Sequence, residues 1–224
     1  MGVLAPWQRF GNNCTSSLSS KATIDRYAQP MSLRDELNEQ AASLRALEDE
    51  VKRTSGALEL ERAHLAPHLA REMSLNRVGI SQRFIERVRE TERRWDEIGN
   101  RAATGDADAI DAALTYLEVR PHFFRSGYIA ERLIKRLVQT PDIVPYVDRV
   151  RVVALGYAHS AAQREIPLVG NMVGKAWTPA LEESLVLALA DAEATNQRSQ
   201  VIKLKYILGS ASQWRRSAAR QRHV

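Results

Sequence analysis

Apolar residues between positions 33 and 65 recur at intervals of seven. The repeating positions are Leu37, Leu44, Val51, Leu58 and Leu65. A second seam half a repeat away contains Leu33 and Leu47, but four polar residues interrupt it, namely Gln40, Thr54, Glu61 and His68. One good seam and one poor seam predict a long, coiled-coil-like helix that packs on one partner helix. A second copy of the chain is one candidate partner, and the five repeating residues are then the self-association contacts.

The next segment carries a single apolar stripe with steps of three and four residues. Its members are Ile80, Phe84, Val88, Thr91, Trp95 and Ile98. This spacing is typical of an amphipathic helix with one buried face. The sequence Thr104-Gly105-Asp106 predicts the end of that helix. The alternative to self-association is therefore that the two long helices fold back on each other as a hairpin within one chain.

From Asp106 onward the pattern predicts short helices separated by proline and glycine. We expect them over residues 107–119, 127–139, 145–158, about 167–176, about 179–194 and about 197–208. The pair Thr178-Pro179 is a strong start signal, because the hydroxyl can cap free N–H groups and proline fits the first helical position. Gly209 is expected to end the last helix.

The predicted fold class is all-α, with long coiled-coil-like N-terminal helices followed by a multi-helix bundle. Four segments are expected: a disordered segment over 1–30, a long-helix module over 31–104, a helical bundle or short α-solenoid over 105–208, and a basic tail over 209–224. Residues 1–30 are rich in Ser, Asn, Gly and Thr and have no apolar periodicity. Met31, where the composition changes, is an alternative start of the chain.

Weak internal similarity favours a repeat within residues 107–208. The pattern Ala-Leu-x-Tyr occurs at 113–116 and again at 154–157, and Thr-Pro pairs begin at positions 140 and 178. Helix pairs at this spacing resemble HEAT-type solenoid repeats. The two spacings, 41 and 38 residues, disagree with each other. An irregular helical bundle is therefore the alternative.

The composition indicates the cellular compartment and limits the classes of partner. Hydrophobic residues make up 44% of the 224 residues, and the single cysteine, Cys14, excludes an intrachain disulfide. A reducing cytoplasm fits best. The net charge is +5, but residues 198–224 carry seven Lys or Arg and no acid, so the rest of the chain has +5 − 7 = −2. The basic character therefore belongs to the C-terminal end, and no membrane partner is expected.

Known catalytic and metal motifs do not fit the sequence. His64 and His68 are four residues apart, but Pro67 would displace the helical turn that brings them together. The stretch Gly170–Ala176 lacks the spacing and the Ser or Thr of a phosphate-binding loop, and no Gly-x-Ser-x-Gly turn occurs. We therefore expect a protein that is not an enzyme, without catalytic residues, cofactor, metal or small-molecule substrate.

Two basic surfaces are candidate contacts for nucleic acid or another anionic partner. With Ser126 as N-cap, a helical projection groups Tyr128, Arg132, Lys135 and Arg136 on the exposed side, with Tyr128 and Arg132 able to stack as a cation–π pair. Phe123 and Phe124 precede this helix and are expected to pack back onto it. The second surface is the tail, with Trp214, Arg215, Arg216, Arg220 and Arg222.

Arginines beside an aromatic ring suit sequence-tolerant binding of nucleic acid. A solubilising tail and a docking peptide for an acidic protein are the alternatives. The sequence as a whole favours a non-catalytic helical scaffold or adaptor with a protein partner and self-association through residues 33–65. A nucleic-acid-binding accessory protein that uses the tail and the Tyr128–Arg136 face is the second hypothesis.

Overall fold

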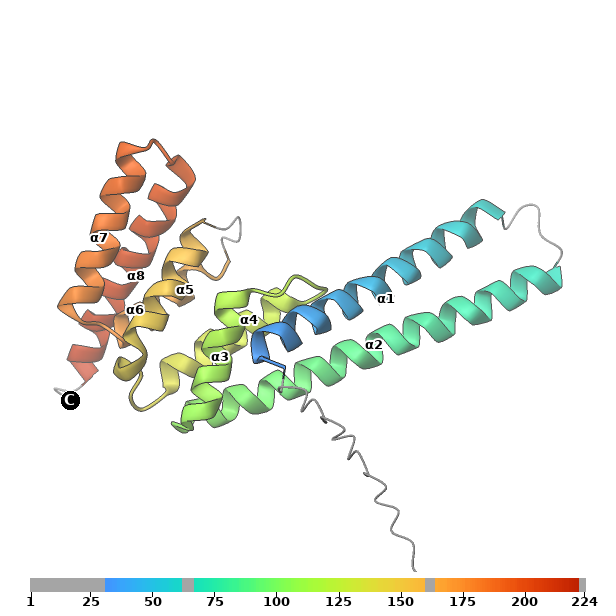
Figure 1. Ribbon diagram of the computed structural model, residues 1–224, viewed down its shortest axis with the longest axis horizontal. Coiled ribbons are helices and arrows are strands. Elements are labelled where there is room, and N and C mark those ends of the chain that lie inside the picture. Colours follow the sequence, from blue (N-terminus) through green and yellow to red (C-terminus); the bar gives the residue numbers. More distant parts are fainter. Residues whose placement is uncertain (1–30, 62–66, 160–163, 222–224) are drawn as a thin grey trace, which may run out of the picture. The chain divides into compact units, whose positions relative to one another are not determined.

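The computed structural model describes residues 31–61, 67–159 and 164–221, and within these ranges the regular structure is helical throughout. The α-helices are α1 (Leu33–Glu61), α2 (Pro67–Ala103), α3 (Ala107–Val119), α4 (Ser126–Gln139), α5 (Val147–His159), α6 (Ile166–Lys175), α7 (Pro179–Ala194) and α8 (Arg198–Gln221). A short 3-10 helix, η1 (Val144–Tyr146), precedes α5. The all-α prediction is confirmed (Figure 1).

The helices pack as successive pairs. Each odd-numbered helix contacts the next odd-numbered one, each even-numbered helix contacts the next even-numbered one, and α1–α2, α3–α4, α5–α6 and α7–α8 pack within their pairs. The pairs differ greatly in length, from 29 and 37 residues in the first to 13 and 10 in the third. Helix-bundle packing is thus consistent with the prediction, while a HEAT-like repeat stays a prediction.

The α1–α2 hairpin places the good heptad seam inside the chain. Leu37 and Leu44 are each 1% exposed, in the same buried cluster as Phe84, Val88 and Trp95 of α2. Gln40, which interrupts the second seam, donates from Nε2 to the Thr91 hydroxyl at 3.2 Å. The two long helices therefore form a hairpin within one chain. Gln40, a polar residue in the second seam of α1, is paired with a polar residue of α2, Thr91.

The predicted self-association residues have different environments. Leu37 and Leu44 are buried by the chain's own helices, and Val51 is half-buried against the same cluster. The side chain of Leu58 and residue Leu65 lie outside the described residues. A dimer seam through Leu37 and Leu44 would require the hairpin to open, and self-association through residues 33–65 stays a prediction.

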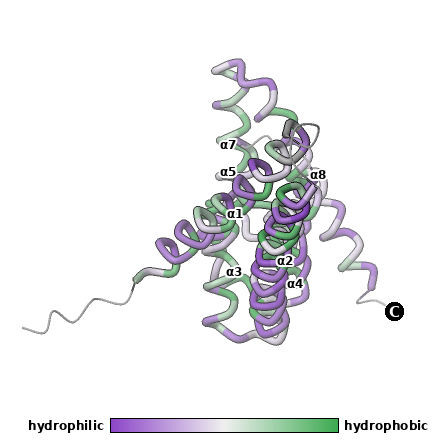
Figure 2. Tube along the Cα trace, turned by 90° about the vertical axis from the view of Figure 1, so that its right-hand side faces the viewer, coloured by the Kyte–Doolittle hydropathy of each residue, from purple (hydrophilic) through white to green (hydrophobic). Residues whose placement is uncertain are grey.

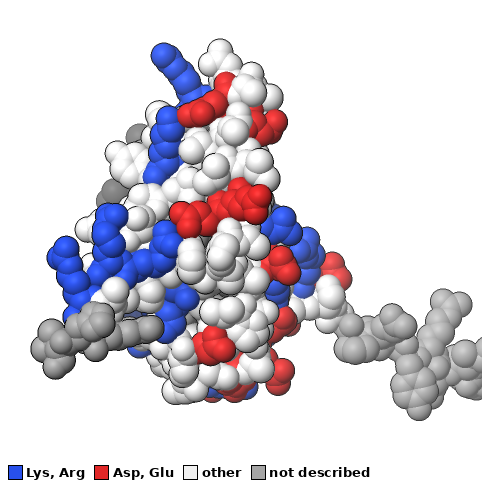
Figure 3. All heavy atoms as spheres, turned by 90° about the vertical axis from the view of Figure 1, so that its left-hand side faces the viewer, with Lys and Arg blue, Asp and Glu red and all other residues white. Residues whose placement is uncertain are grey.

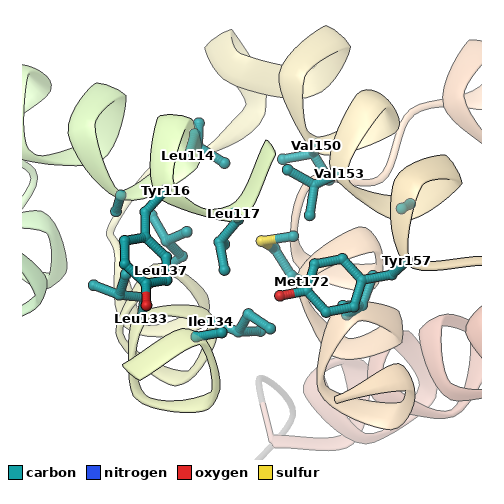
Figure 4. Close-up of a cluster of buried hydrophobic side chains, with 14 of the residues drawn as sticks. Leu114, Tyr116, Leu117, Leu133, Ile134, Leu137, Val150, Val153, Tyr157 and Met172 are labelled. Carbon is teal, nitrogen blue, oxygen red and sulfur yellow. The ribbon is translucent and has the colours of Figure 1, made fainter. Parts of the chain in front are cut away.

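The central core joins α3 and α4 to α5 and α6. In Figure 4, Leu117 and Ile134 lie toward Val150, Val153 and Met172, with Tyr116 and Leu137 on one side and Tyr157 on the other. The Trp95 ring packs on Tyr116 with centroids 4.6 Å apart. Burial raises the pKa of both tyrosine hydroxyls well above their usual value. Figure 2 shows the contrast between this core and α2, which is mostly hydrophilic along its length.

Two predicted helix starts are each capped by the side chain of the preceding residue, as was expected for Thr178. The Thr178 hydroxyl accepts a hydrogen bond from the Leu181 N–H at 3.1 Å, with Pro179 as the first helical residue of α7. Asp106 caps α3 in the same way through the Ala109 N–H. The predicted boundary at residues 104–106 is a turn between α2 and α3, and the described residues from Ser32 onward form one compact unit across it.

The C-terminal segment differs from the expectation. Gly209 does not end the last helix, and α8 continues to Gln221. The reason is tertiary packing: Ile207 and Ala211 of α8 lie against Gly170 and Gly174 of α6, where a Cβ atom would come within 2.8 Å of a carbonyl oxygen of each. Close backbone contact thus outweighs the weak helix propensity of one glycine. The segment described as a tail is, up to Gln221, the end of a packed helix.

Residues 1–30, predicted to be disordered, lie outside the described part of the chain. None of the helices among the described residues combines the length and the apolar character that crossing a bilayer requires.

Candidate anionic-partner site

The C-terminal end of α8 forms one wall of a groove of about 480 Å³, which we call the α6–α8 groove. Its other walls come from the end of α6 and from the segment between α4 and η1. The lining residues are Pro141, Asp142, Ile143, Val144, Gly174, Lys175, Trp177, Trp214, Arg215, Ala218 and Ala219. The groove thus combines two tryptophans, two cations and one carboxylate, Asp142, from segments that are distant in the sequence.

A contact cluster holds one side of the α6–α8 groove in place. The Arg215 guanidinium carbon lies 4.6 Å from the centroid of the Trp177 ring. Glu182 of α7 accepts from the Trp177 indole N–H at 2.7 Å and pairs with Arg215 at 3.3 Å. The indole hydrogen bond, followed by the Arg215 charge, lowers the pKa of the Glu182 carboxyl below its usual value. Arg215 is therefore a positioned residue with its charge partly neutralised.

Other cations near the groove have no such compensation. Lys175 lines the groove, whereas Arg216 and Arg220 lie one turn apart on the exposed side of α8 and do not line it. Within the described residues, none of the three has an acidic partner, and Arg216 donates only to the Ser212 hydroxyl. Figure 3 shows Lys and Arg gathered around this end of α8. Arg222, the last predicted contact, lies outside the described residues.

Trp214 is half-buried at the base of this site. Its Cβ lies 3.2 Å from where a Cβ on Gly174 would be placed, so the absence of a side chain at Gly174 allows the two helices to come together. The costly exposure of a tryptophan in a solvated tail therefore does not arise. Part of the ring remains available at the groove, where Trp177 is 37% exposed.

The Tyr128–Arg136 face has a different electrostatic character. Arg132 pairs with Asp96 of α2 at 2.7 Å, and Lys135 pairs with Glu131 at 2.7 Å. Arg136 donates to Gln139 at 3.2 Å. Two of the three cations are already paired with carboxylates of the same chain, which reduces the attraction that this face offers to an anionic partner.

Three local predictions for this face need correction. Tyr128 stacks with Arg164 at 4.3 Å and with Arg125 at 5.6 Å, and not with Arg132, because Arg132 extends to α2. The N-cap is Arg125 in the left-handed conformation, so Ser126 is the first residue of α4 and its hydroxyl accepts from the Phe123 N–H. Phe123 is buried as expected, but Phe124 is half exposed and packs on Phe84 of α2 with ring centroids 5.7 Å apart.

Lys175, Trp177 and Glu182 were not predicted from the sequence as parts of a site. Trp177 directly precedes the Thr178-Pro179 cap, and a tryptophan at a helix junction is a usable signal. The 3- and 4-residue steps through Ile207, Ala211 and Trp214 would also have predicted that α8 continues. Nothing local in the sequence indicates that Glu182 and Arg215 meet, because they are 33 residues apart.

The stretch Gly170–Ala176 is helical up to Lys175, in agreement with the rejection of a phosphate-binding loop. Among the described residues, no three His, Cys, Asp or Glu side chains come together in a way that could hold a metal ion. His68 lies in the first turn of α2, and His64 is outside the described residues.

No protein-family model, curated protein or solved structure gives a significant match to this chain.

Proposed function

We propose that this protein is a non-catalytic helical adaptor that holds macromolecules together, and that an acidic segment of a protein partner binds at the C-terminal end of α8. The observation that carries the proposal is the concentration of cations without an acidic partner at this end of the described chain. Lys175 lines the groove with two tryptophans, and Arg216 and Arg220 extend the positive surface along the exposed side of α8. Arginine clusters are a common means of recognising acidic motifs.

The rigid setting of the site supports this role. The end of α8 is fixed to α6 at Gly170 and Gly174, and Arg215 is held by Glu182 and Trp177. A preformed cationic surface loses less conformational entropy on binding than a disordered basic tail would. The opposite end of the chain, the α1–α2 hairpin, is a separate surface on which a second partner or another copy of the protein could bind.

Nucleic-acid binding is the second candidate function, and the groove tryptophans favour it. Bases stack on aromatic side chains while neighbouring cations contact the phosphates, without a requirement for a particular sequence. Trp177 and Trp214 line the groove with Lys175, which supplies both kinds of contact, while Glu182 partly neutralises the charge of Arg215. The Tyr128–Arg136 face plays a smaller part in this hypothesis, because Arg132 and Lys135 are paired within the chain.

A comparison of two ligands with equal charge tests the proposal. The full-length protein is titrated with fluorescein-labelled oligoglutamate and with fluorescein-labelled oligothymidylate, and binding is followed by fluorescence anisotropy. The adaptor proposal predicts that oligoglutamate binds at least as tightly as oligothymidylate. Much tighter binding of oligothymidylate would support the second candidate, and no binding of either ligand would contradict both.

A further inference from the structure

A second cavity, of about 330 Å³, lies between the start of α6 and the N-terminal half of α8. It is lined by Ile166, Pro167, Ser199, Ile202, Lys203 and Tyr206. Lys203 and Trp214 are 11 residues apart on α8, or roughly 16 Å along the helix axis, so this cavity is distinct from the α6–α8 groove. Its volume is at the lower end of the range of small-molecule sites, roughly 300–1,000 Å³.

Lys203 is the unusual residue of this cavity. Only 4% of its surface is exposed, and it has no hydrogen bond or ion pair with any residue that the structure describes. Lysine is almost never fully buried unless it is paired, and its ammonium group usually stays in contact with water at the end of a buried stem. Lys205, two residues further along, shows the ordinary situation, since it is exposed and pairs with Glu193 at 2.9 Å.

The nearest buried carboxylate is directed elsewhere. Glu165 directly precedes the lining residue Ile166 and is itself 7% exposed. Its Oε1 lies 3.2 Å from the position that a Cβ on Gly127 would occupy, which places it at the start of α4. Glu165 and Lys203 form no ion pair. The positive charge of Lys203 therefore remains uncompensated by the helices that surround it.

The remaining walls of the cavity are mainly apolar. Ile202 and Tyr206 are 54% and 62% exposed, which is unusual for large apolar side chains one turn apart on a helix. Ile166 and Pro167 form the facing wall at the N-terminal end of α6, where the helix dipole favours a negative charge. The cavity thus presents one cation, carried by a mostly buried side chain, and a favourable dipole beside an apolar surface.

We infer that this cavity binds a small carboxylate with an apolar body, with the carboxylate at Lys203 and the body against Ile202 and Tyr206. A free aliphatic acid has this chemistry, and so does a peptide C-terminus with an apolar last residue. Neither the groove tryptophans nor the cations at the end of α8 take part, so this site and the proposed function can fail independently.

Isothermal titration of the full-length protein tests the inference with octanoate as the free acid and acetyl-Ala-Leu as the peptide C-terminus. At least one is expected to bind with a stoichiometry of one, and the tighter one identifies the source. Octylamine, with the same apolar chain and the opposite charge, is expected not to bind. The inference would be overturned if octanoate and octylamine bound equally, or if neither octanoate nor acetyl-Ala-Leu bound.

Substitution of the buried lysine tests the role of its charge. Lys203→Met keeps the apolar stem and removes the ammonium, and we expect at least tenfold weaker carboxylate binding with an unchanged or higher melting temperature. Lys205→Met, on the same helix, is the matched control and is expected to bind as the wild type does. If Lys203→Met does not fold, Ile202→Ser at the exposed rim takes its place and is expected to weaken binding. Unchanged affinity in the folded variant would contradict the site.

Discussion

The Arg215 guanidinium lies over the Trp177 ring at 4.6 Å, and Glu182 contacts both residues. Three segments meet in this contact: the connection between α6 and α7, the start of α7 and the C-terminal half of α8. The cluster fixes the direction in which α8 leaves the core. It thereby determines where Arg216 and Arg220 stand relative to the groove.

The Glu182 contact predicts a pH-dependent stability. Its pKa is lower in the folded chain than in the unfolded one, so its contribution is present above the unfolded carboxyl pKa and is lost as the pH falls through the folded one. Glu182→Gln is expected to lower the melting temperature at pH 7, with a difference from wild type that shrinks as the pH falls below about 4.5. Thermal melts of both proteins from pH 7 to pH 3 measure this. A difference that grows on acidification would contradict the contact.

The close packing of α6 on α8 predicts opposite effects for two glycine substitutions. Gly170→Ala would place a Cβ 2.5 Å from the Ser210 Cβ and 2.8 Å from the Ile207 carbonyl oxygen, so we expect a loss of about 1–3 kcal/mol. Gly209→Ala, in the same helix pair, meets no atom within 4 Å and should stabilise α8 by about 0.5–1 kcal/mol. Urea unfolding measures both values. Equal effects would mean that α8 does not pack on α6 in this way.

The Gln40–Thr91 hydrogen bond predicts a non-additive pair of substitutions. Gln40→Ala leaves the buried Thr91 hydroxyl without one of its partners and is expected to cost about 1–2 kcal/mol. Gln40→Leu combined with Thr91→Val replaces both polar groups by apolar ones and should recover most of that loss. Asn38→Leu, on the exposed side of α1, is the control for a general effect of added apolar surface. Simple additivity in a double-mutant cycle would count against the contact.

Leu44 distinguishes an intrachain hairpin from a dimer seam. Because the side chain is buried within one chain, Leu44→Ala is expected to lower the free energy of unfolding by about 2–5 kcal/mol at every protein concentration. The molar mass by light scattering should stay that of the wild type while the variant remains folded. A variant that keeps its stability but halves its mass would instead identify Leu44 as a dimer contact.

The parts of the fold that sequence alone predicts are those set by local patterns. The stripe from Ile80 to Ile98 defines the buried face of α2, and Thr178 and Asp106 define two helix starts through short-range capping. Gln40 interrupts the second apolar seam of α1, and the sequence does not show that it has a polar partner. That partner, Thr91, is 51 residues away. Local patterns do not indicate which distant polar groups satisfy each other.

The candidate site was only partly predictable for the same reason. The excess of Arg at the C-terminus is evident from the composition, and Trp214 is conspicuous beside it. The helical state of that segment depends on Gly170 and Gly174 of α6, which a glycine-based helix stop at Gly209 ignores. The groove itself needs Lys175 and Trp177, whose relation to Arg215 arises only when α6, α7 and α8 pack together.

The most direct test of the proposed contact surface compares two variants that each lose two positive charges from α8. Arg216→Gln with Arg220→Gln removes two uncompensated cations from the C-terminal end of α8. The matched control, Arg198→Gln with Lys205→Gln, removes the same charge from the other half of the helix. Binding of labelled oligoglutamate and oligothymidylate to the full-length proteins is measured over a range of salt concentrations.

We predict weaker binding of the anionic ligand by the Arg216/Arg220 variant. For oligothymidylate, the slope of log K against log salt concentration should flatten by about 1.4, which corresponds to two lost phosphate contacts. The Arg198/Lys205 control should keep the wild-type slope and affinity. Indistinguishable binding by the two variants, with both ligands, would contradict the assignment of the anionic-partner site to the C-terminal end of α8.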